Sequence, residues 1–395
     1  MHLDPLIPTL VAASFVVLAV GLLFSRLRQP QVVAYLLAGV AIGPDGIAII
    51  SDPQVVQRLG DAGVVLLLFF LGMEISLPRL LSNWRVPVLG TLIQIAAGVG
   101  LVVGVGEWLG WPLARSVLLG FVISLSSTAV VIRMLHDFAE TETSVGHDVI
   151  GVLLVQDLAL VPMLIVIGHM GGVPGAGGDI VLQIAGALGL AGLLLFLARG
   201  SQLRIPFASA LRRDHELQVF AAFAVCFGMA TATALLGLSS AVGAFVGGIL
   251  VANARETDWV RKSLEPFHVL LVAFFFVSIG MLIDLQFVRD AFGVVLLLTA
   301  LAVVTNTAIN AAIFRFLGRD WANSVYGGAL LSQIGEFSFV LAAVGLGARV
   351  ISEYAYQATI AVIALTMLVT PAYVVAIRRV RTRAASRGRE PVTPS

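Results

Sequence analysis

The feature that most constrains this chain is the recurrence of apolar runs of about 20 residues from one end to the other. A helix of that length crosses a hydrocarbon layer of ~30 Å. Hydrophobic residues make up 59% of the 395 residues and charged residues only 12%, whereas soluble domains carry about 25% charged residues. A mean hydropathy of +1.00 does not suit a soluble protein, because a soluble domain must also cover a polar surface. The sequence therefore predicts an all-α protein that crosses a membrane many times.

Thirteen apolar runs can be counted, and each is predicted to span the membrane once. They cover residues 6–25, 31–50, 60–77, 86–106, 115–135, 146–169, 179–198, 215–236, 239–252, 265–284, 291–314, 322–347 and 355–377. The first run follows His2 and Asp4 rather than a basic segment, so we expect a retained span and not a cleaved signal peptide. An odd number of spans places the two ends of the chain on opposite faces.

The distribution of basic residues supports this count, because cytoplasmic loops carry an excess of Lys and Arg. If the basic tail at 378–395 is cytoplasmic, twenty of the 24 Lys and Arg residues fall on that side. The four on the other side are Arg58, Arg115, Arg289 and Arg349. One missed or added span would scramble the pattern, so we predict an external N-terminus and a cytoplasmic C-terminus. Arginine outnumbers lysine 23 to 1, a usage typical of GC-rich bacteria, and a bacterial inner membrane is expected.

A motif in the third predicted span recurs in the tenth. The pattern Gly-Met-x-Ile-x-Leu occupies residues 72–77 and again 280–285, at an offset of 208, and the same offset carries Gly39 onto Gly247. An offset of seven spans pairs helices of opposite orientation, as in the inverted repeats of many secondary transporters. The predicted organisation is a transmembrane domain at 1–377 with a first repeat at about 6–169, a connecting helix at 179–198 and a second repeat at about 215–377.

The same offset brings two polar clusters into register in spans five and twelve. Their members are Ser124, Ser126, Ser127 and Thr128 in span five, and Ser332, Gln333, Gly335 and Glu336 in span twelve. Inverted-repeat transporters bind their substrates near the midplane, between helices broken at corresponding positions. The alternative is that small hydroxyl residues only allow close packing of intact helices. Glu336 in span twelve favours a pair of broken helices.

Asp157 is the acidic residue nearest the middle of the bilayer, about eleven residues into span six. A carboxylate there is costly, and low dielectric favours its protonated form. A proton and a cation can therefore compete for it, and exclusive binding couples the two fluxes if the occupied site alone reorients. Gln156 offers a neutral oxygen, and Pro162 frees a backbone carbonyl nearby. The alternative is a structural carboxylate that caps a neighbouring helix.

The remaining polar residues in or near spans are less informative. Glu336 is either a second titratable group or a structural tie to the broken backbone, and the sequence leaves both open. Glu74 lies near the cytoplasmic end of span three and is expected at the interface. His136 and His147 fall on the loop between spans five and six, where solvated histidines are expected. Cys226 lies in an apolar run and is expected to be a small buried hydrophobe.

Five motifs, taken together and in order, resemble the monovalent cation:proton antiporter-2 family, and most of all the membrane domain of Kef-type potassium efflux systems. They are Ser-Leu-Ser-Ser-Thr-Ala at 124–129, Gln-Asp at 156–157, Leu-Glu-Pro-Phe at 264–267, Phe-Phe-Val-Ser-Ile-Gly-Met at 275–281 and Ser-Gln-Ile-Gly-Glu-Phe-Ser at 332–338. The resemblance, over about residues 10–377, implies a sodium/hydrogen-exchanger fold: a dimerisation domain and a mobile core that contains two crossed, broken helices and works by an elevator motion. It also implies that Gln156 and Asp157 form the ion site, lined or braced by Ser127, Thr128 and Glu336. The accessory candidates are Ser126, Gln333 and Asn306.

Two departures from the family pattern matter. Kef-type proteins carry a cytoplasmic nucleotide-binding domain after the last span, whereas about eighteen polar residues follow it here. Gating through such a domain is therefore expected to be absent or supplied by a separate regulatory subunit. Many relatives also have a lysine in span eleven that pairs with the core aspartate, and register places Asn306 there. Without that ammonium, Asp157 is expected to hold a proton more readily, and a single exchangeable charge favours an electroneutral cycle.

The predicted function is antiport of K⁺ or Na⁺ against H⁺ by a homodimer embedded in lipid, with the cation bound at Asp157. The alternative is channel-like potassium efflux without obligatory proton coupling. The sequence offers no Walker-type loop for ATP, no nucleophile and base arranged for catalysis within the membrane, and no sign of a cofactor or nucleic-acid partner. A carboxylate, an amide and several hydroxyls suit a hard monovalent cation but do not separate Na⁺ from K⁺.

Overall fold

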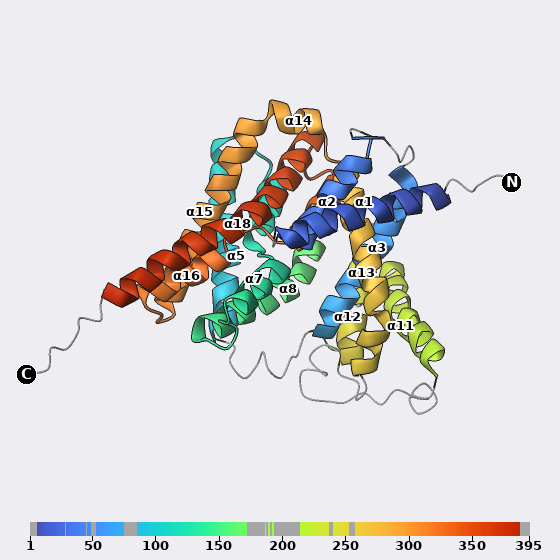
Figure 1. Cartoon of the computed structure of the whole chain (residues 1–395), viewed down its shortest axis with the longest axis horizontal. Coiled ribbons are helices and arrows are strands. Elements are labelled where there is room, and N and C mark those ends of the chain that lie inside the picture. Colours follow the sequence, from blue (N-terminus) through green and yellow to red (C-terminus); the bar gives the residue numbers. More distant parts are fainter. Residues whose placement is uncertain are drawn as a thin grey trace, which may run out of the picture. The chain divides into compact units, whose positions relative to one another are not determined.

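The computed structural model describes residues 6–27, 29–44, 46–48, 53–74, 85–171, 214–236, 240–252 and 257–387, together with positions 186, 189 and 192. All regular structure in this described part is helical (Figure 1). The helices are α1 (Leu6–Arg26), α2 (Gln31–Ile42), α3 (Pro53–Glu74), the π-helical turn η1 (Arg85–Leu89), α5 (Gly90–Trp108), α6 (Leu113–Ser124), α7 (Thr128–Asp137), α8 (Ser144–Met170), α11 (His215–Leu235), α12 (Ser240–Ala252), α13 (Thr257–Met281), α14 (Leu285–Asp290), α15 (Phe292–Phe316), α16 (Trp321–Leu330), α17 (Phe337–Gly347) and α18 (Glu353–Arg387).

The predicted all-helical membrane architecture is confirmed. In the described part, seven helices are long and apolar enough to cross a membrane, and shorter apolar helices accompany them. Twelve of the thirteen predicted spans coincide with one helix or with two consecutive helices. The seventh, at 179–198, lies almost entirely outside the described residues, as does the end of the basic tail at 388–395.

Two boundaries differ from the sequence-based expectation. Span two was expected to reach residue 50, but α2 ends at Ile42, because Gly43 and Pro44 follow and neither favours helix continuation. The last helix was expected to end near residue 377, but α18 continues to Arg387. Between Pro371 and Gly388 the sequence contains no Gly or Pro, and Arg and Ala are good helix formers. Part of the basic tail is therefore a helical extension of the last span.

Spans five and twelve are both broken, as the polar clusters predict. Span five consists of α6 and α7, separated by residues 125–127, and span twelve of α16 and α17, separated by residues 331–336. Leu125 has φ −94° and ψ 129°, so the first break is extended backbone. Ser127 caps α7 by accepting a hydrogen bond from the Val130 N–H at 3.3 Å. Backbone of this kind is tolerated at membrane depth only where protein or water satisfies its polar groups.

The chain forms two compact units. The first contains Met1–Asn83, Ala159–Leu285 and Ala343–Ser352, and the second contains Trp84–Leu158, Gln286–Ala342 and Glu353–Ser395. The helix α8 contributes to both, with the boundary one residue after Asp157. All eight residues predicted for the ion site belong to the second unit.

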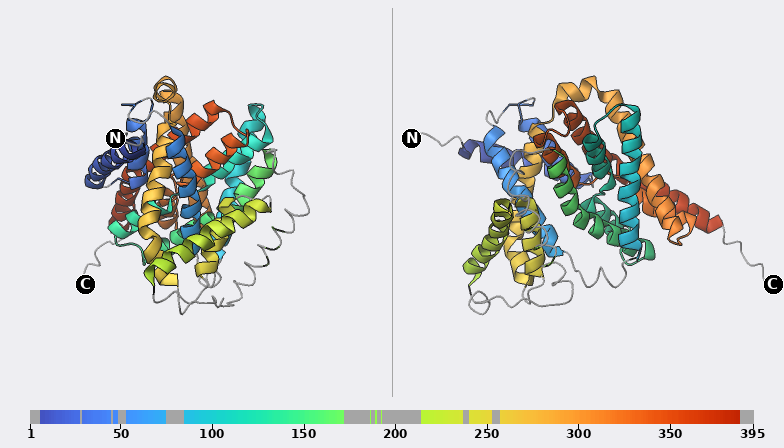
Figure 2. Two further views of the ribbon diagram at one scale, coloured as in Figure 1. Left: turned by 90° about the vertical axis from the view of Figure 1, so that its right-hand side faces the viewer. Right: turned by 180° about the vertical axis from the view of Figure 1, so that it is seen from behind.

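Close backbone contacts hold the first unit together. There α3 packs on α12 and α13, and α2 packs on α13 (Figure 2). Gly39 of α2 faces Gly280 of α13, where a Cβ atom on either would clash with backbone of the other helix. Gly72 of α3 faces Gly248 of α12 in the same manner. Small residues let membrane helices approach this closely and gain van der Waals contact.

These glycine contacts bear on the predicted repeat. Val277 O lies against Gly39 and Phe69 O against Gly248, and residues 69 and 277 are related by the offset of 208. The partner of Gly72 is Gly248 and not Gly247, which instead lies against the Met229 side chain of α11. Span two therefore maps onto span nine at an offset one residue longer than the one between spans three and ten. Reciprocal contacts are what an inverted repeat produces, and the repeat itself stays a prediction.

The second unit surrounds the two broken spans. Within it α5 packs on α6, α15 packs on α5 and α16, and α18 packs on α15 and α16 (Figure 2). Polar side chains deep in this unit come from α5, α6, α8, α15, α16, α17, α18 and the two breaks. Each such side chain is costly in a membrane unless its hydrogen bonds are made. The arrangement of those bonds defines the candidate site.

Candidate functional site

The two breaks cross each other and exchange hydrogen bonds. The Gly335 N–H donates to Leu125 O at 2.8 Å, and Ser126 Oγ donates to Leu331 O at 2.9 Å. Gln333 Nε2 reaches Ser127 O at 3.4 Å. A Cβ atom on Gly335 would lie 2.5 Å from Ser126 O, so the two backbone segments can pass this closely only with glycine at position 335. Backbone groups that are freed by one break are thus satisfied in part by the other.

Asp157 lies on α8 beside the first break, and 2% of its surface is exposed. Its Oδ2 accepts a hydrogen bond from Thr128 Oγ1 at 3.0 Å. Thr128 is the first residue of α7, whose N-terminal end carries the positive pole of the helix dipole. A buried carboxylate is therefore placed at the positive end of a half-helix. Although Pro162 lies one turn further on, α8 continues through it as one helix.

Gln156 joins α8 to the break through its amide. Its Oε1 accepts from the Ser126 N–H at 2.9 Å, and its Nε2 donates to Gln94 Oε1 at 2.7 Å. Gln94, on α5, in turn donates from Nε2 to Ser124 O at 3.1 Å. Sequence reasoning missed Gln94, although an isolated amide in the apolar run 89–106 is a signal that could have found it.

Asn306 lies on α15, and its side-chain amide contacts both breaks. Nδ2 donates to Ile123 O at 2.9 Å and to Ser332 O at 3.3 Å. Ile123 belongs to the last turn of α6, and Ser332 follows the end of α16, so both carbonyls lie at the negative poles of half-helices. The amide therefore satisfies carbonyls at the ends of two half-helices.

Glu336 immediately precedes the first residue of α17, with 7% of its surface exposed. A carboxylate there lies at the positive pole of the half-helix. Ser338, in the first turn of α17, donates from Oγ to Val122 O of α6 at 2.8 Å. This placement suits a structural tie between Glu336 and the broken backbone. The alternative role of Glu336, as a second titratable group in transport, stays a prediction.

The structure thus brings the predicted residues to one crossing. Ser126, Ser127 and Thr128 lie on the first break, Gln333 and Glu336 on the second, and Gln156, Asp157 and Asn306 on the flanking helices. Among the described residues, no group of three or more His, Cys, Asp or Glu side chains is arranged to hold a metal ion. The oxygens at the crossing are those of a carboxylate, hydroxyls, amides and backbone carbonyls, all hard ligands.

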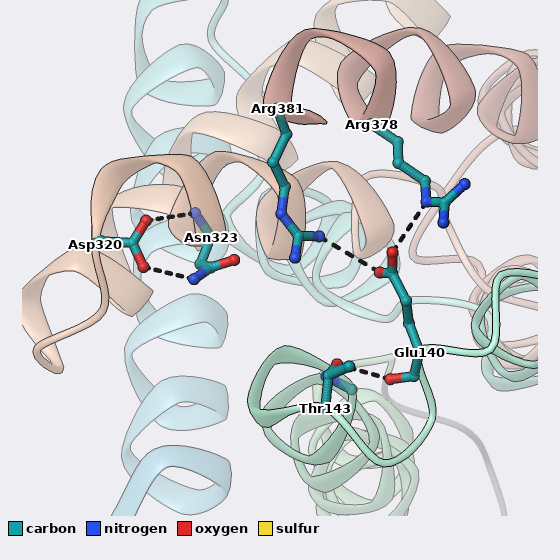
Figure 3. A network of polar contacts seen from close by, with 7 residues as sticks. Glu140, Thr143, Asp320, Asn323, Arg378 and Arg381 are labelled. Atoms are coloured by element: carbon teal, nitrogen blue, oxygen red, sulfur yellow. Dashed lines mark hydrogen bonds and ion pairs between the residues drawn. The ribbon is translucent and has the colours of Figure 1, made fainter. Parts of the chain in front are cut away.

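A second polar network, at the loop between α7 and α8, was not predicted from the sequence. Glu140 accepts hydrogen bonds from Arg378 Nε at 2.9 Å and Arg381 Nη1 at 3.4 Å, both on α18 (Figure 3). Burial acts to raise the pKa of Glu140, but contacts with Tyr326, Arg378 and Arg381 outweigh it and hold the pKa below its ordinary value of 4.5. This network ties the loop to the helical extension of the last span.

The other residues of that region are exposed or paired. Arg319 forms two hydrogen bonds with Asp148 at the start of α8, at 2.6 and 2.9 Å. Asp320 caps α16 by accepting from the Asn323 N–H at 3.0 Å (Figure 3). His147 Nε2 lies 3.3 Å from Glu142 Oε2, and both side chains are largely exposed, as expected. The expected loop position is wrong, however, because His136 lies in the last turn of α7 and His147 in the first turn of α8. Cys226 is buried, as expected.

Comparison with protein families decides the class of protein. Residues 11–378 match the model of the family described as "Sodium/hydrogen exchanger, transmembrane". The chain belongs to this family. The predicted resemblance is therefore confirmed: the chain is a multi-pass membrane transporter of the cation:proton antiporter class and not an enzyme.

Named relatives cover most of the chain. It is 36% identical to the iron transporter MagA of Paramagnetospirillum magneticum, over 96% of this chain and 88% of that protein. It is 34% identical to K(+) efflux antiporter 5 of Arabidopsis thaliana, over 89% of this chain and 63% of the relative. With the glutathione-regulated potassium-efflux protein KefC of Klebsiella pneumoniae, the identity is 31%, over 92% and 59%. The chain thus spans about three fifths of these two potassium-efflux relatives.

A solved structure supports the fold. The sodium proton antiporter MjNhaP1 of Methanocaldococcus jannaschii matches with a TM-score of 0.63 over 96% of this chain and 98% of that one. Sequence identity is 15%, so the match establishes the shared fold and no more.

Proposed function

We propose that this transporter exchanges a monovalent cation, K⁺ or Na⁺, for H⁺, and that the two compete for Asp157. The observation that supports the proposal most is the buried carboxylate of Asp157 at the crossing of two broken helices, hydrogen-bonded to Thr128 at 3.0 Å. A buried carboxylate in a membrane is costly when it is charged and binds no cation. It is stabilised either by a proton or by a cation, so one ligand replaces the other.

Coupling follows if the second unit changes its exposure to the two sides only when Asp157 is occupied. We place this movement in the second unit because every predicted site residue belongs to it. An elevator-type motion of that unit, in a homodimer in the bacterial inner membrane, would carry the proton and the cation in opposite directions. Because one carboxylate takes one proton or one monovalent cation, the proposed cycle is electroneutral.

The names of the curated relatives point to different cations. The curated relatives include an iron transporter as well as potassium-efflux proteins. The carboxylate, hydroxyl and carbonyl oxygens at the crossing suit a hard monovalent cation, whereas iron sites in proteins usually include imidazole or thiolate ligands. We therefore propose K⁺ or Na⁺ and include Fe²⁺ in the test.

The deciding experiment is transport by purified protein in liposomes that contain a pH-sensitive dye. A gradient of K⁺, Na⁺, Li⁺, Rb⁺ or Fe²⁺ is imposed in turn across the liposome membrane. In the wild type, a gradient of K⁺ or Na⁺ is expected to drive proton movement. Asp157→Asn is expected to abolish that movement, whereas Asp290→Asn, in the exposed helix α14, should not change it. Coupled exchange that survives in Asp157→Asn would overturn the site assignment.

The same liposomes separate the antiporter from its alternatives. A channel-like efflux pathway would carry current down the cation gradient without obligatory proton movement. Electroneutral exchange should not respond to an imposed membrane potential. A rate that rises or falls with that potential would reject the one-for-one cycle while leaving antiport intact.

A further inference from the structure

The buried side-chain amides of Gln94 and Gln156 form a series of hydrogen bonds. The backbone groups at its two ends fix which amide atom donates and which accepts. Gln94 Nε2 donates to Ser124 O at 3.1 Å, and a backbone carbonyl can only accept. Gln94 therefore presents its oxygen to Gln156 Nε2, at 2.7 Å. Gln156 in turn presents its oxygen to the Ser126 N–H, at 2.9 Å, and a backbone N–H can only donate. Reversing either amide would set like groups against each other.

Both ends of this hydrogen-bond series are backbone groups that the first break leaves without helical partners. Ser124 is the last residue of α6, so its carbonyl has no intrahelical donor, and Ser126 lies in the extended segment. No more than 2% of the surface of Ser124, Ser126, Gln94 or Gln156 is exposed. In such surroundings an unmade hydrogen bond is costly, so the two amides hold the break against α5 and α8.

The residues next to this hydrogen-bond series are the ones that meet at the ion site. Asp157 follows Gln156 on α8, and Thr128 follows Ser126 by two residues. The Gln156–Ser126 bond therefore sets how far α8 lies from the start of α7, and with it the 3.0 Å contact between Thr128 Oγ1 and Asp157 Oδ2. Gln94 makes its own hydrogen bonds to Ser124 and Gln156, and it acts on this contact through the position that it gives to Gln156.

We infer that Gln94 is a positioning residue of the ion site: it fixes the amide of Gln156 and thereby the alignment of Thr128 with Asp157. The inference deepens the proposed function and rests on Asp157 being the ion site. Gln94 itself does not contact the ion. Its loss should therefore weaken cation binding more than it slows the loaded transporter.

The test compares three variants in the liposome assay. Gln94→Met keeps the length of the side chain but cannot form either hydrogen bond, and it is expected to raise the KM for the cation about tenfold while the maximal rate changes less than about threefold. Gln94→Glu can donate to Ser124 O only while protonated, so its KM relative to wild type should fall as the pH is lowered. Gln218→Met, which replaces another buried glutamine in α11, is the matched control and should behave as wild type.

A double variant tests whether Gln94 acts through Gln156. If it does, Gln94→Met should raise the KM little further in a Gln156→Met background, because Gln156→Met already removes the hydrogen bond between the two side chains. A full additional tenfold rise would overturn the inference, as would an unchanged KM in Gln94→Met. Absence of pH-dependent recovery in Gln94→Glu would contradict the proposed bond to Ser124.

Amide hydrogen exchange provides a readout that does not depend on transport. Gln94→Met should speed exchange in peptides that cover residues 124–128, since the Ser126 N–H loses a firmly held acceptor, and should leave α11 peptides unchanged. Unaltered exchange at 124–128 would reject the positioning role whatever the transport assay shows. A wild type that exchanges no cation would instead reject the proposed function, so the two failures are distinguishable.

Discussion

At the residue scale, the contact between Thr128 and Asp157 suits a carboxylate that alternates between two charge states. A hydroxyl both donates and accepts, so Thr128 Oγ1 can donate to the ionised carboxylate and accept from the protonated one. An ammonium can only donate, and it favours the ionised form throughout. With Asn306 donating to the carbonyls of Ile123 and Ser332, the described contacts fit a site on which proton and cation take turns.

Thr128→Val tests this role, because valine keeps the shape of threonine and removes the hydroxyl. Loss of a hydrogen bond to the charged carboxylate costs about 1.5 kcal/mol, which corresponds to about one pH unit. Since the hydrogen bond to the charged form is the stronger of the two, its loss weakens that form more, so protons should compete more strongly and half-maximal exchange should move to higher pH by up to about that amount. The measurement is the pH profile of exchange in liposomes.

Two controls accompany the Thr128 variant. Thr128→Ser retains the hydroxyl and should keep the wild-type profile. Thr305→Val removes a hydroxyl that bonds its own helix, at Leu301 O, and should also leave the profile in place. A profile for Thr128→Val that is unshifted or moves to lower pH would contradict the role given to this hydroxyl.

At the element scale, the breaks in spans five and twelve could be predicted, whereas the side-chain contacts that brace them could not. Serine, threonine and glycine in otherwise apolar runs mark the breaks locally, and hydropathy alone marks the spans. The brace from Gln94 to Gln156 joins residues 62 positions apart, and the bond from Arg378 to Glu140 joins residues 238 apart. Such partners are decided by tertiary packing, which leaves no periodic trace in the sequence. The choice of Gly248 over Gly247 likewise depends on how two helices cross.

Gly335→Ala tests whether the two breaks must pass as closely as they do. The added methyl would lie 2.5 Å from Ser126 O and 2.6 Å from Ser126 C, so the backbone must shift, at a cost of about 1–3 kcal/mol. We expect a lower unfolding temperature in detergent together with a large loss of exchange. Gly100→Ala in α5 has open space around its Cβ and should be neutral or slightly stabilising. Equal unfolding temperatures and exchange rates in the two variants would show that the crossing of the two breaks tolerates a side chain at position 335.

The network around Glu140 predicts a pH-dependent contribution to stability. Because the folded-state pKa of Glu140 lies below 4.5, its contribution is fully present above the unfolded-state value and is lost as the pH falls through the folded-state value. Glu140→Gln should therefore lower stability by about 1 kcal/mol at neutral pH, a modest amount because Arg378 and Arg381 are partly exposed. Thermal unfolding from pH 8 down to about pH 3, below the ordinary pKa of the carboxyl, is the measurement, with the exposed Glu142→Gln as control. A difference from wild type that grows toward acid pH would refute this account.

At the scale of the whole molecule, the two helix breaks and the glycine-to-glycine helix contacts are divided between the two units. The predicted ion-site residues all fall in the second unit, where amide and hydroxyl groups satisfy the broken backbone. The first unit relies on glycine contacts between α2, α3, α12 and α13. Shape-based packing of this kind needs no polar groups in the bilayer. The division is the one expected if one unit carries the ion and the other provides a fixed support.

The positive-inside count makes a prediction about the chain as a whole that labelling can test. Glu142 precedes α8 and Asp290 ends α14, and both residues are exposed. The helices α8, α11, α12 and α13 lie between them, so four spans would put both residues on the same face. The seventh predicted span, at 179–198, makes five and puts Glu142 inside and Asp290 outside.

The test begins from Cys226→Ala, which removes the single cysteine and is mild because that side chain is small and buried. Glu142→Cys and Asp290→Cys are then introduced separately, and intact cells are treated with a membrane-impermeant maleimide. We expect labelling of the cysteine at 290 in intact cells, and of the cysteine at 142 only after the membrane is opened. The excess of arginine on one side is the physical reason, since positively charged loops stay in the cytoplasm. Labelling of both positions from the same side would remove the seventh span and, with it, the pairing of oppositely oriented helices on which the inverted repeat depends.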